Sequence, residues 1–229
     1  MALYAIGDFH LSLAKEKPMD IFGEIWHNHT EKIRKNFSEL HDEDVSVLCG
    51  DLSWGMSLEE SLPDLKFVNE LPGRKILLKG NHDYWWNTAS KIKSFFAENG
   101  IDTIEILHNN CCFYGDYALC GTRGWFYEEE KGIEHDKKIM RREIMRLETS
   151  LKAAGDKEKL VFLHYPPIYQ HYRCEEILEL LKNYSVRLCC YGHIHGKGMQ
   201  YAFNGWQGGT EFRLVSADHL NFVPMKLKE

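Results

Sequence analysis

The sequence predicts an α/β protein, and two observations carry that prediction. Short apolar runs alternate with amphipathic stretches through most of the chain, as in a series of strands and helices. Five of the apolar runs end in Asp, Asn or His, four of them after one intervening Gly. In open α/β sheets, ligand sites collect at the carboxyl ends of the strands, so the same pattern predicts one polar site there.

The elements of the first half follow from apolar runs and helical spacing. Phe22 to Leu40 places its large apolar residues three or four positions apart, which predicts a helix. Leu58 to Leu71 and Asn87 to Glu98 are further predicted helices, the second closed by Asn99-Gly100. The predicted strands, each an apolar run, are Leu3–Ile6, Val45–Cys49, Lys75–Lys79 and Ile104–Leu107.

The second half begins with a hairpin signal and ends in a β-rich tail. Gly115-Asp116 separates two apolar runs, Cys111–Tyr114 and Tyr117–Gly121. Leu160–Leu163 and Val186–Tyr191 are predicted strands, and Ile133–Leu151 and Glu175–Leu181 are predicted helices. Glu128–Glu130 is predicted to be a solvated loop. Met199 to Leu227 predicts two or three antiparallel strands, with turns near Asn204-Gly205 and Ala217-Asp218.

Length and composition favour a single folded domain over residues 1–229. No Pro-, Gly- or Ser-rich linker divides the 229 residues, which contain only 6 Pro. An aromatic content of 13% excludes a disordered chain. The formal charge of −6 argues against nucleic acid as a partner. The sequence makes no prediction of oligomeric state.

Cellular location is predicted from the cysteines and from apolar run lengths. The 7 cysteines are odd in number and form no C-x-x-C pair, so we expect buried thiols rather than a disulfide framework. Such thiols indicate a reducing compartment, and we expect the cytoplasm. No apolar run approaches the roughly 18 residues of a membrane span, and the N-terminus lacks the pattern of a signal peptide.

The polar residues at the five strand ends predict a metal centre. Taken singly, each fits a turn, a helix cap or a hydrogen-bonded core histidine. Taken together they do not, because burying them unpaired costs roughly 1–3 kcal/mol for each neutral group and more for each charge. A bound cation removes that cost. The residues are Asp8-x-His10, Asp51, Asn81-His82-Asp83, His164 and His193-x-His195.

These motifs, with their flanking glycines, resemble those of the calcineurin-like metallophosphoesterases from residue 7 to residue 196. The resemblance implies a four-layer α/β/β/α sandwich with two central mixed β-sheets, and a dinuclear metal site. It also implies the role of each residue. Asp8, His10 and His195 hold one metal; Asn81, His164 and His193 hold the other; Asp51 bridges the two, and His82 is a catalytic histidine that binds no metal.

The nitrogen and oxygen ligand set suits two divalent or trivalent transition-metal ions, with Mn, Fe or Zn expected. Two divalent ions, two aspartates and a bridging hydroxide leave a net charge of about +1, which attracts phosphoryl oxygens. The expected reaction is direct attack of metal-bound hydroxide on phosphorus. His82 would orient the phosphoryl group or protonate the leaving oxygen, and Asp83 is a candidate for fixing the His82 tautomer.

Four further residues are candidates for binding the substrate. Trp54, Tyr84 and Trp125 would form an aromatic wall for a base, sugar or aryl group, with core packing as the competing role. Arg123 would grip a phosphate, with a structural salt bridge as the competing role.

The expected function is hydrolysis of phosphomonoester or phosphodiester bonds in small substrates. The alternatives are protein Ser/Thr phosphatase-like or nuclease activity, or a non-catalytic scaffold on the same fold. Gly50 to Gly55 lacks the GDxxDRG pattern of the Ser/Thr phosphatases, which weighs against that branch. Metallo-β-lactamase-like enzymes and amidohydrolases fit the H-x-H motif less well: the former want Asp where Lys197 stands, and the latter place the motif on the first strand.

Overall fold

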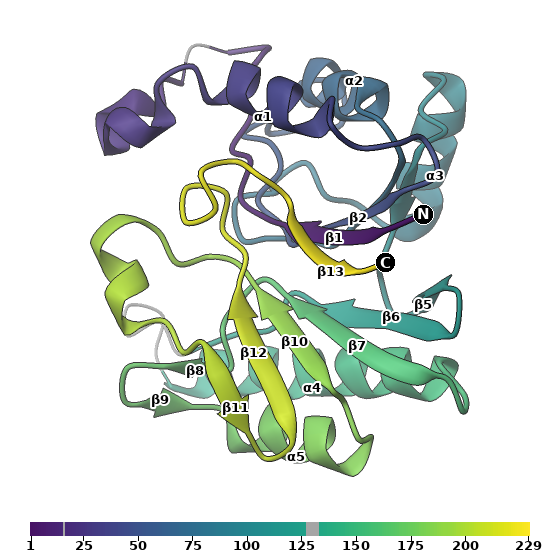
Figure 1. The fold of residues 1–229 in the computed structure, drawn as a ribbon, viewed down its shortest axis with the longest axis vertical. Helices are drawn as coiled ribbons and strands as arrows, with labels where there is room; N and C mark the ends of the chain where they lie inside the picture. Colours follow the sequence, from purple (N-terminus) through teal and green to yellow (C-terminus); the bar gives the residue numbers. More distant parts are fainter. Residues whose placement is uncertain (16, 127–132) are drawn as a thin grey trace.

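Two mixed β-sheets face each other at the centre of the molecule, and helices cover the outer face of each (Figure 1). The structure is a computed structural model that describes residues 1–15, 17–126 and 133–229. The predicted four-layer α/β/β/α sandwich is confirmed. The acidic run Glu128–Glu130 lies outside the described residues.

The first sheet has the strand order β13-β1-β2-β3-β4. Strands β1 to β4 run parallel, and β13 pairs antiparallel with β1 at the edge. Helices α1, α2 and α3 cover its outer face (Figure 1). The bounds are β1 Leu3–Ile6, β2 Val45–Leu48, β3 Arg74–Leu77, β4 Ile104–Ile106, β13 Met225–Lys228, α1 His29–Phe37, α2 Leu62–Glu70 and α3 Ala89–Glu98.

The second sheet has the strand order β11-β12-β10-β7-β6-β5. Its four central strands are parallel, and β5 and β11 pair antiparallel at the two edges. Helices α4 and α5 cover its outer face (Figure 1). The bounds are β5 Cys111–Tyr114, β6 Tyr117–Thr122, β7 Glu158–Leu163, β10 Leu188–Tyr191, β11 Gly205–Gln207, β12 Thr210–Leu214, α4 Ile133–Ala153 and α5 Glu175–Asn183.

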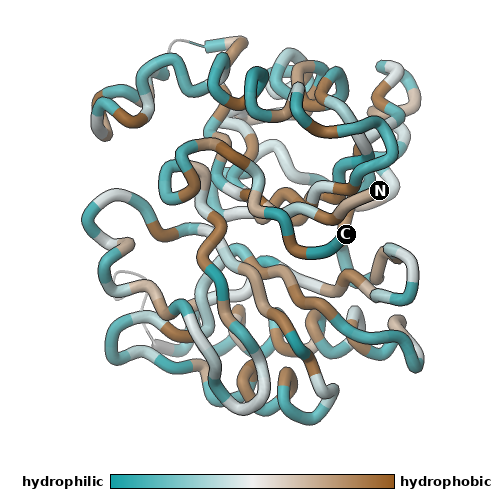
Figure 2. Tube along the Cα trace, viewed as in Figure 1, coloured by the Kyte–Doolittle hydropathy of each residue, from teal (hydrophilic) through white to brown (hydrophobic). Residues whose placement is uncertain are grey.

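Because side chains alternate along the strands, apolar side chains form three layers: one between the two sheets, and one between each sheet and its helices. In β1, Leu3 and Ala5 point between the sheets, whereas Ile6 faces the helices. The predicted apolar face of α4 packs on the second sheet through Met140, Leu147 and Leu151. In Figure 2 the hydrophobic residues accordingly follow the strands and the inner faces of the helices.

Main-chain hydrogen bonds join the two sheets at the carboxyl ends of their strands. Gly7 donates its N–H to the carbonyl of Val215 (2.7 Å), and Val215 donates to the carbonyl of Tyr191 (2.8 Å). Gly192 then donates to the carbonyl of His164 (3.1 Å). The ends of β1, β10 and β7 are therefore fixed beside one another.

Two predictions of local structure are wrong. The helix expected over Phe22 to Leu40 is only α1, preceded by two 3₁₀ turns, η1 (Asp20–Phe22) and η2 (Glu24–Trp26). Gly23 (φ 130°) and Asn28 (φ 52°) leave the right-handed helical region, so no continuous helix crosses them. In the tail, β11 and β12 pair antiparallel as expected but turn at Gly208-Gly209 instead of Asn204-Gly205, and β12 also runs parallel to β10.

Three short elements were not predicted from the sequence. Strands β8 (Ile168–Tyr169) and β9 (Tyr172–Arg173) form a separate two-stranded sheet, and η4 (Gly196–Tyr201) follows the H-x-H motif. Each is too short to give a hydrophobic period.

The cysteines are free, and six of the seven are buried. Within the described ranges, no helix combines the length and the apolar character that a membrane crossing requires.

Candidate metal centre

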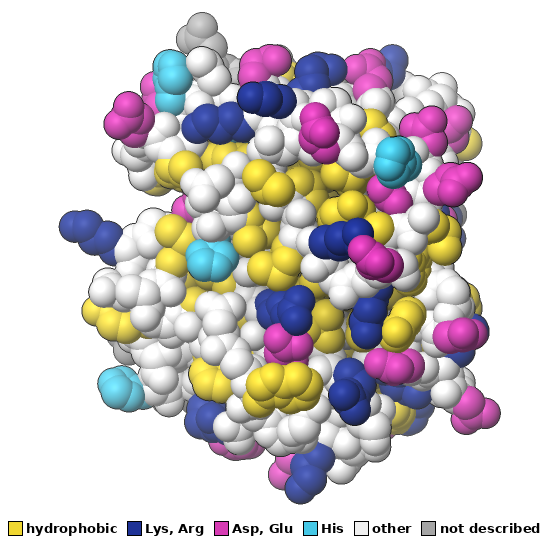
Figure 3. Space-filling model, viewed as in Figure 1, with side chains coloured by type: hydrophobic (Ala, Val, Ile, Leu, Met, Phe, Trp, Pro, Cys, Tyr) yellow, Lys and Arg dark blue, Asp and Glu magenta, His cyan; other side chains and the backbone are white. Residues whose placement is uncertain are grey.

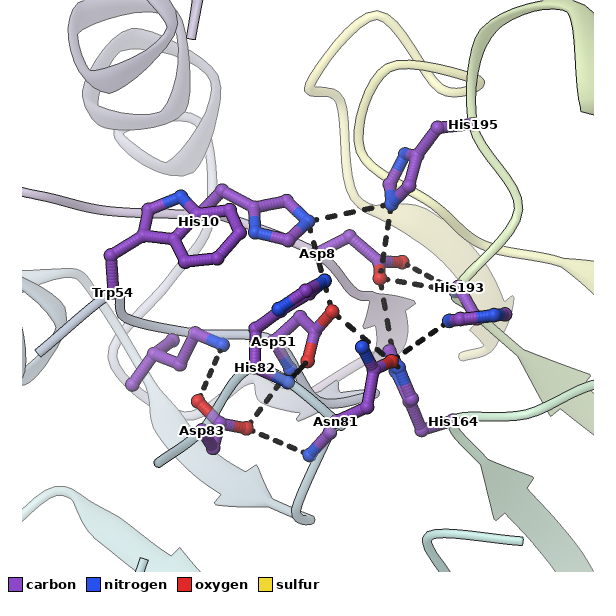
Figure 4. Close-up of polar contacts among 12 residues, drawn as sticks. Asp8, His10, Asp51, Trp54, Asn81, His82, Asp83, His164, His193 and His195 are labelled. Atoms are coloured by element: carbon purple, nitrogen blue, oxygen red, sulfur yellow. Dashed lines mark hydrogen bonds and ion pairs between the residues drawn. The ribbon is translucent and has the colours of Figure 1, made fainter. Parts of the chain in front are cut away.

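The strand ends of both sheets bring the predicted ligands together (Figure 4). Two groups of three side chains each have their ligand atoms within 4.8 Å of one another. One group is Asp8, His10 and His195, and the other is Asp51, His164 and His193. Six of the seven predicted ligands thus fall into two neighbouring groups, and Asn81 contacts the second.

In the first group, ring nitrogens and a carboxylate oxygen converge. His195 Nε2 lies 3.3 Å from Asp8 Oδ1 and 3.4 Å from His10 Nε2. Asp8 is completely buried, and His10 is 4% exposed. At the second group, an amide oxygen and ring nitrogens converge in the same way. Asn81 Oδ1 lies 2.6 Å from His164 Nε2 and 2.9 Å from His193 Nδ1.

Asp51 lies between the two groups. Its Oδ2 is 3.5 Å from His164 Nε2 and 3.8 Å from His10 Nε2. Its Oδ1 accepts a hydrogen bond from the backbone N–H of His82 (2.7 Å). One carboxylate oxygen is therefore within reach of both groups, which is the geometry required of a bridging ligand.

Hydrogen bonds behind the rings orient two of the histidines. His164 Nδ1 lies 3.0 Å from the Cys49 carbonyl, which accepts a proton but cannot donate one. Burial lowers the pKa of His164 to about 3, so the ring is neutral and its Nε2 carries a lone pair. His195 Nδ1 lies 2.8 Å from Asp218 Oδ1 in the same way. Such outer partners orient metal-binding imidazoles.

The charges of the site fit a cation. Burial raises the pKa of Asp51 well above its ordinary value, and the neighbouring carboxylates Asp83 and Asp8 add to the shift. At His195, burial opposes protonation, but Asp8 and Asp218 outweigh it and raise the pKa to about 10. A proton and a metal ion would therefore compete for His195 Nε2. Buried oxygen and nitrogen atoms that face one another are the ligand atoms that a hard or borderline metal ion binds.

The backbone is strained at four of these positions. Asp8 (φ 62°), His10 (φ 48°), Asp51 (φ 51°) and His193 (φ 73°) all occupy the left-handed region. A non-glycine residue there is uncommon, and such strain clusters at functional sites.

Glycines make room for the carboxylates. A Cβ on Gly192 would lie 2.5 Å from Asp8 Oδ2, and a Cβ on Gly80 would overlap Asp51 Oδ1. The glycines that flank the motifs therefore let the backbone approach the ligands.

Asp83 braces the loops that carry Asp51 and Asn81. Its fully buried carboxylate accepts hydrogen bonds from the backbone N–H groups of Gly80 (2.7 Å) and Asp51 (3.0 Å). Leu52, Ser53 and the Trp85 indole donate to its other oxygen. Because these donors occupy both oxygens, we reassign Asp83 from fixing the His82 tautomer to holding the two loops together.

The predicted substrate residues occupy different surroundings. Trp54 stacks on His10 (5.0 Å between ring centroids) and lies 4.4 Å from the ring of His82. Tyr84 is 54% exposed, with its hydroxyl 3.4 Å from His82 Nδ1. Trp125 lies in the core, 4% exposed, and donates its indole N–H to Asp136 (3.2 Å).

Arg123 lies outside the two ligand groups. Its guanidinium stacks over the Trp125 ring (4.8 Å), and Nη2 lies 3.8 Å from the buried Glu143. This ion pair is the structural role that competes with phosphate binding. Arg123 also lines a basic cavity with Lys79, Arg142 and Arg146.

Sequence reasoning missed Asp218 and one wall of the site. Asp218 lies in a turn without a motif, and only the fold places it behind His195. Met19, Phe22 and Trp26 lie next to the site because η1 and η2 replace the expected helix. No local signal in the sequence marks either feature.

Fold and site together define a protein with a candidate two-metal centre at the carboxyl ends of the strands of both sheets of an α/β/β/α sandwich. The chain matches the calcineurin-like phosphoesterase family (Metallophos) over residues 1–197. It belongs to that family. No curated protein matches it.

Solved structures share the fold at low sequence identity. A protein of unknown function from Aquifex aeolicus, AQ665, is 19% identical (TM-score 0.54), covering 98% of this chain and 95% of its own. The phosphopantetheinyl hydrolase PptH from Mycobacterium tuberculosis is 11% identical (TM-score 0.61), with coverages of 99% and 95%. TT1561 of Thermus thermophilus is 15% identical (TM-score 0.55), with coverages of 92% and 86%. At these identities, the similarity concerns the fold.

Replacing Asp51 by Asn tests the bridging position. We expect Asp51→Asn to bind fewer metal ions per chain, because a neutral amide removes the charge that both groups share. Elemental analysis of desalted, metal-loaded protein measures this. Asp116→Asn, at a fully exposed carboxylate, is the control and should keep its metal. Full metal content and full activity in Asp51→Asn would refute the bridging assignment.

Replacing Asp83 by Asn tests the brace. The amide leaves buried N–H groups without an acceptor, at roughly 1–3 kcal/mol for each. We therefore expect Asp83→Asn to lower the free energy of unfolding by a few times RT or more, measured by denaturant titration of the metal-free protein. An unchanged free energy of unfolding would show that the hydrogen bonds to Asp83 do not stabilise the loops.

Proposed function

We propose that this protein is a dinuclear-metal-dependent phosphoesterase that hydrolyses phosphomonoester or phosphodiester bonds of small substrates. The observation that carries the proposal is the position of Asp51, one carboxylate within reach of two groups of buried ligands. Membership of the calcineurin-like phosphoesterase family supports it. When bound, two metal ions would supply activated water and positive charge that stabilises the phosphoryl oxygens.

The residues of the protein provide the ligands of this centre and keep them in position. Asp8, His10 and His195 are proposed to bind one ion, and Asn81, His164 and His193 the other, with Mn, Fe or Zn as the expected metals. Asp218 and the Cys49 carbonyl orient the rings of His195 and His164 so that Nε2 of each faces the other ligands. Asp83 keeps the Asp51 and Asn81 loops together.

His82 is the proposed acid or orienting group. Its half-buried ring packs against both Trp54 and His10, with centroids 4.4 and 5.7 Å away, and lines the cavity beside the site. It belongs to neither group of ligands. A proton on its imidazole would therefore be free to pass to the leaving oxygen.

Two observations favour a small substrate over the alternatives. All predicted ligand positions are retained and brought together, which weighs against a scaffold without catalysis. The overall charge of −6 weighs against a nuclease.

The seven free cysteines support the proposal of a cytoplasmic location.

Paired assays test the function. We expect hydrolysis of p-nitrophenyl phosphate, bis-p-nitrophenyl phosphate, or both, when Mn²⁺ is present, and loss of it when a chelator removes the metal. The ratio of the two rates separates a monoesterase from a diesterase. If neither ester is cleaved by protein loaded in turn with Mn²⁺, Fe²⁺ and Zn²⁺, the proposed activity on simple esters is wrong.

A substitution at His82 separates catalysis from metal binding. We expect His82→Ala to retain its metal ions and to lose roughly 10²–10⁴-fold in kcat, the usual contribution of a general acid or base. Metal content and steady-state rates are measured on the same preparation. Loss of the metal ions from this variant would contradict the role given to His82.

A further inference from the structure

A cavity of about 280 Å³ opens directly beside the candidate metal centre. This volume is close to the lower end of the range for small-molecule sites, about 300–1,000 Å³. Four of the residues that line the cavity are His10, His82, His195 and Gly196. The other four are apolar: Met19, Phe22, Trp26 and Trp54. We call these four residues the apolar wall.

The inner part of the apolar wall is fixed by packing. Trp26 is 3% exposed and packs edge-on against Phe222 (5.3 Å between centroids) and His195 (5.7 Å). The Trp54 indole N–H donates to Met19 Sδ (3.3 Å). Because this N–H is used within the wall, the part of the Trp54 ring that lines the cavity is apolar, and the Lys17 ammonium lies over the ring, 3.0 Å from its centroid.

Phe22 completes the wall at its mouth. It is 60% exposed, in contrast to the buried Trp26 and Met19. In Figure 3 the molecule is hollowed between the segment that carries η1 and η2 and the segment that carries η4, and hydrophobic side chains border the hollow. An aromatic ring at the mouth of a hollow can cover a bound group that the inner wall already contacts.

One basic group, Lys17, lies next to the wall: its Nζ is 3.0 Å from the centroid of the Trp54 ring, although Lys17 does not line the cavity. Lys79, Arg142 and Arg146 line a different cavity, beyond the ends of β3, β4 and β6. Apart from the histidines of the centre, no ionisable side chain of the described residues lines the cavity of the apolar wall. Apart from the histidines, the lining of this cavity is therefore apolar and favours a ring or an alkyl group.

We propose that the apolar wall binds the alcohol part of the phosphoester, so that the substrates are phosphate esters of aromatic or otherwise apolar alcohols. The inference rests on the proposed function, because the phosphoryl group must lie at the metal centre. His10 and His195 belong to both the candidate metal centre and the cavity, and the proposed acid His82 also lines the cavity. A phosphorus atom held at the centre therefore has its ester substituent beside Trp54 and Phe22.

A pair of exposed neighbours allows a matched test. Phe22 lines the cavity, whereas Ile21 precedes it in the same 3₁₀ turn, is 72% exposed and does not line it. We compare wild type, Phe22→Ala and Ile21→Ala, loaded with Mn²⁺, on 1-naphthyl phosphate, phenyl phosphate and glycerol 2-phosphate.

We expect wild type to prefer naphthyl over phenyl phosphate in kcat/KM, because the two leaving groups differ mainly in apolar area. Phe22→Ala should lower kcat/KM for naphthyl phosphate by roughly 3–10-fold, because alanine removes the apolar surface that the ring would bury against the ester, and should lower kcat/KM for glycerol phosphate by less. Ile21→Ala should change neither. Binding of phenylphosphonate, measured by calorimetry, should weaken in Phe22→Ala, whereas binding of methylphosphonate should not.

The outcomes separate the inference from the function on which it rests. Metal-dependent hydrolysis without preference for apolar esters, or equal effects of Phe22→Ala on all three, would overturn the apolar wall as the binding site and leave the phosphoesterase standing. Failure to hydrolyse any of the three esters would count against the proposed function as well. Equal reductions of kcat/KM for naphthyl phosphate in Phe22→Ala and Ile21→Ala would mean that activity depends on the 3₁₀ turn and not on the Phe22 ring. That result would also overturn the inference.

Discussion

Repulsion among buried acceptors is the constraint on which the rest of this structure depends. Carboxylate oxygens, an amide oxygen and imidazole lone pairs face one another within 2.6 to 3.8 Å at the junction of the two sheets. Such groups are costly to bury without compensation. Burial and the neighbouring carboxylates together raise the pKa of Asp51. Metal ions between these atoms would turn the repulsion into attraction.

The fold holds the acceptors in place from behind. The hydrogen bonds through Gly7, Val215 and Tyr191 tie the end of β1 to that of β10, so ligands almost two hundred residues apart share one site. Left-handed backbone at Asp8 and His193 directs their side chains into it, and Gly192 allows the close approach. Stability of the junction and geometry of the site thus depend on the same contacts.

Much of this could be predicted from the sequence, because its signals are local. Apolar runs identified nearly all of the strands, and polar residues at their ends, together with the family resemblance, identified the ligands. The long helix expected after Phe22 was wrong because helical spacing says nothing about the backbone at Gly23 and Asn28. Asp218, the loop-bracing role of Asp83, and the part of the apolar wall made by Met19, Phe22 and Trp26 could not be predicted, since each arises from contacts between distant segments.

The most direct test of the central claim is an anomalous difference map from crystals of the Mn²⁺-loaded protein. We expect two peaks about 3.5–4 Å apart, as in two-metal sites, with Asp51 between them. One peak should lie against Asp8, His10 and His195, and the other against Asn81, His164 and His193. A single peak, or peaks away from Asp51, would contradict it.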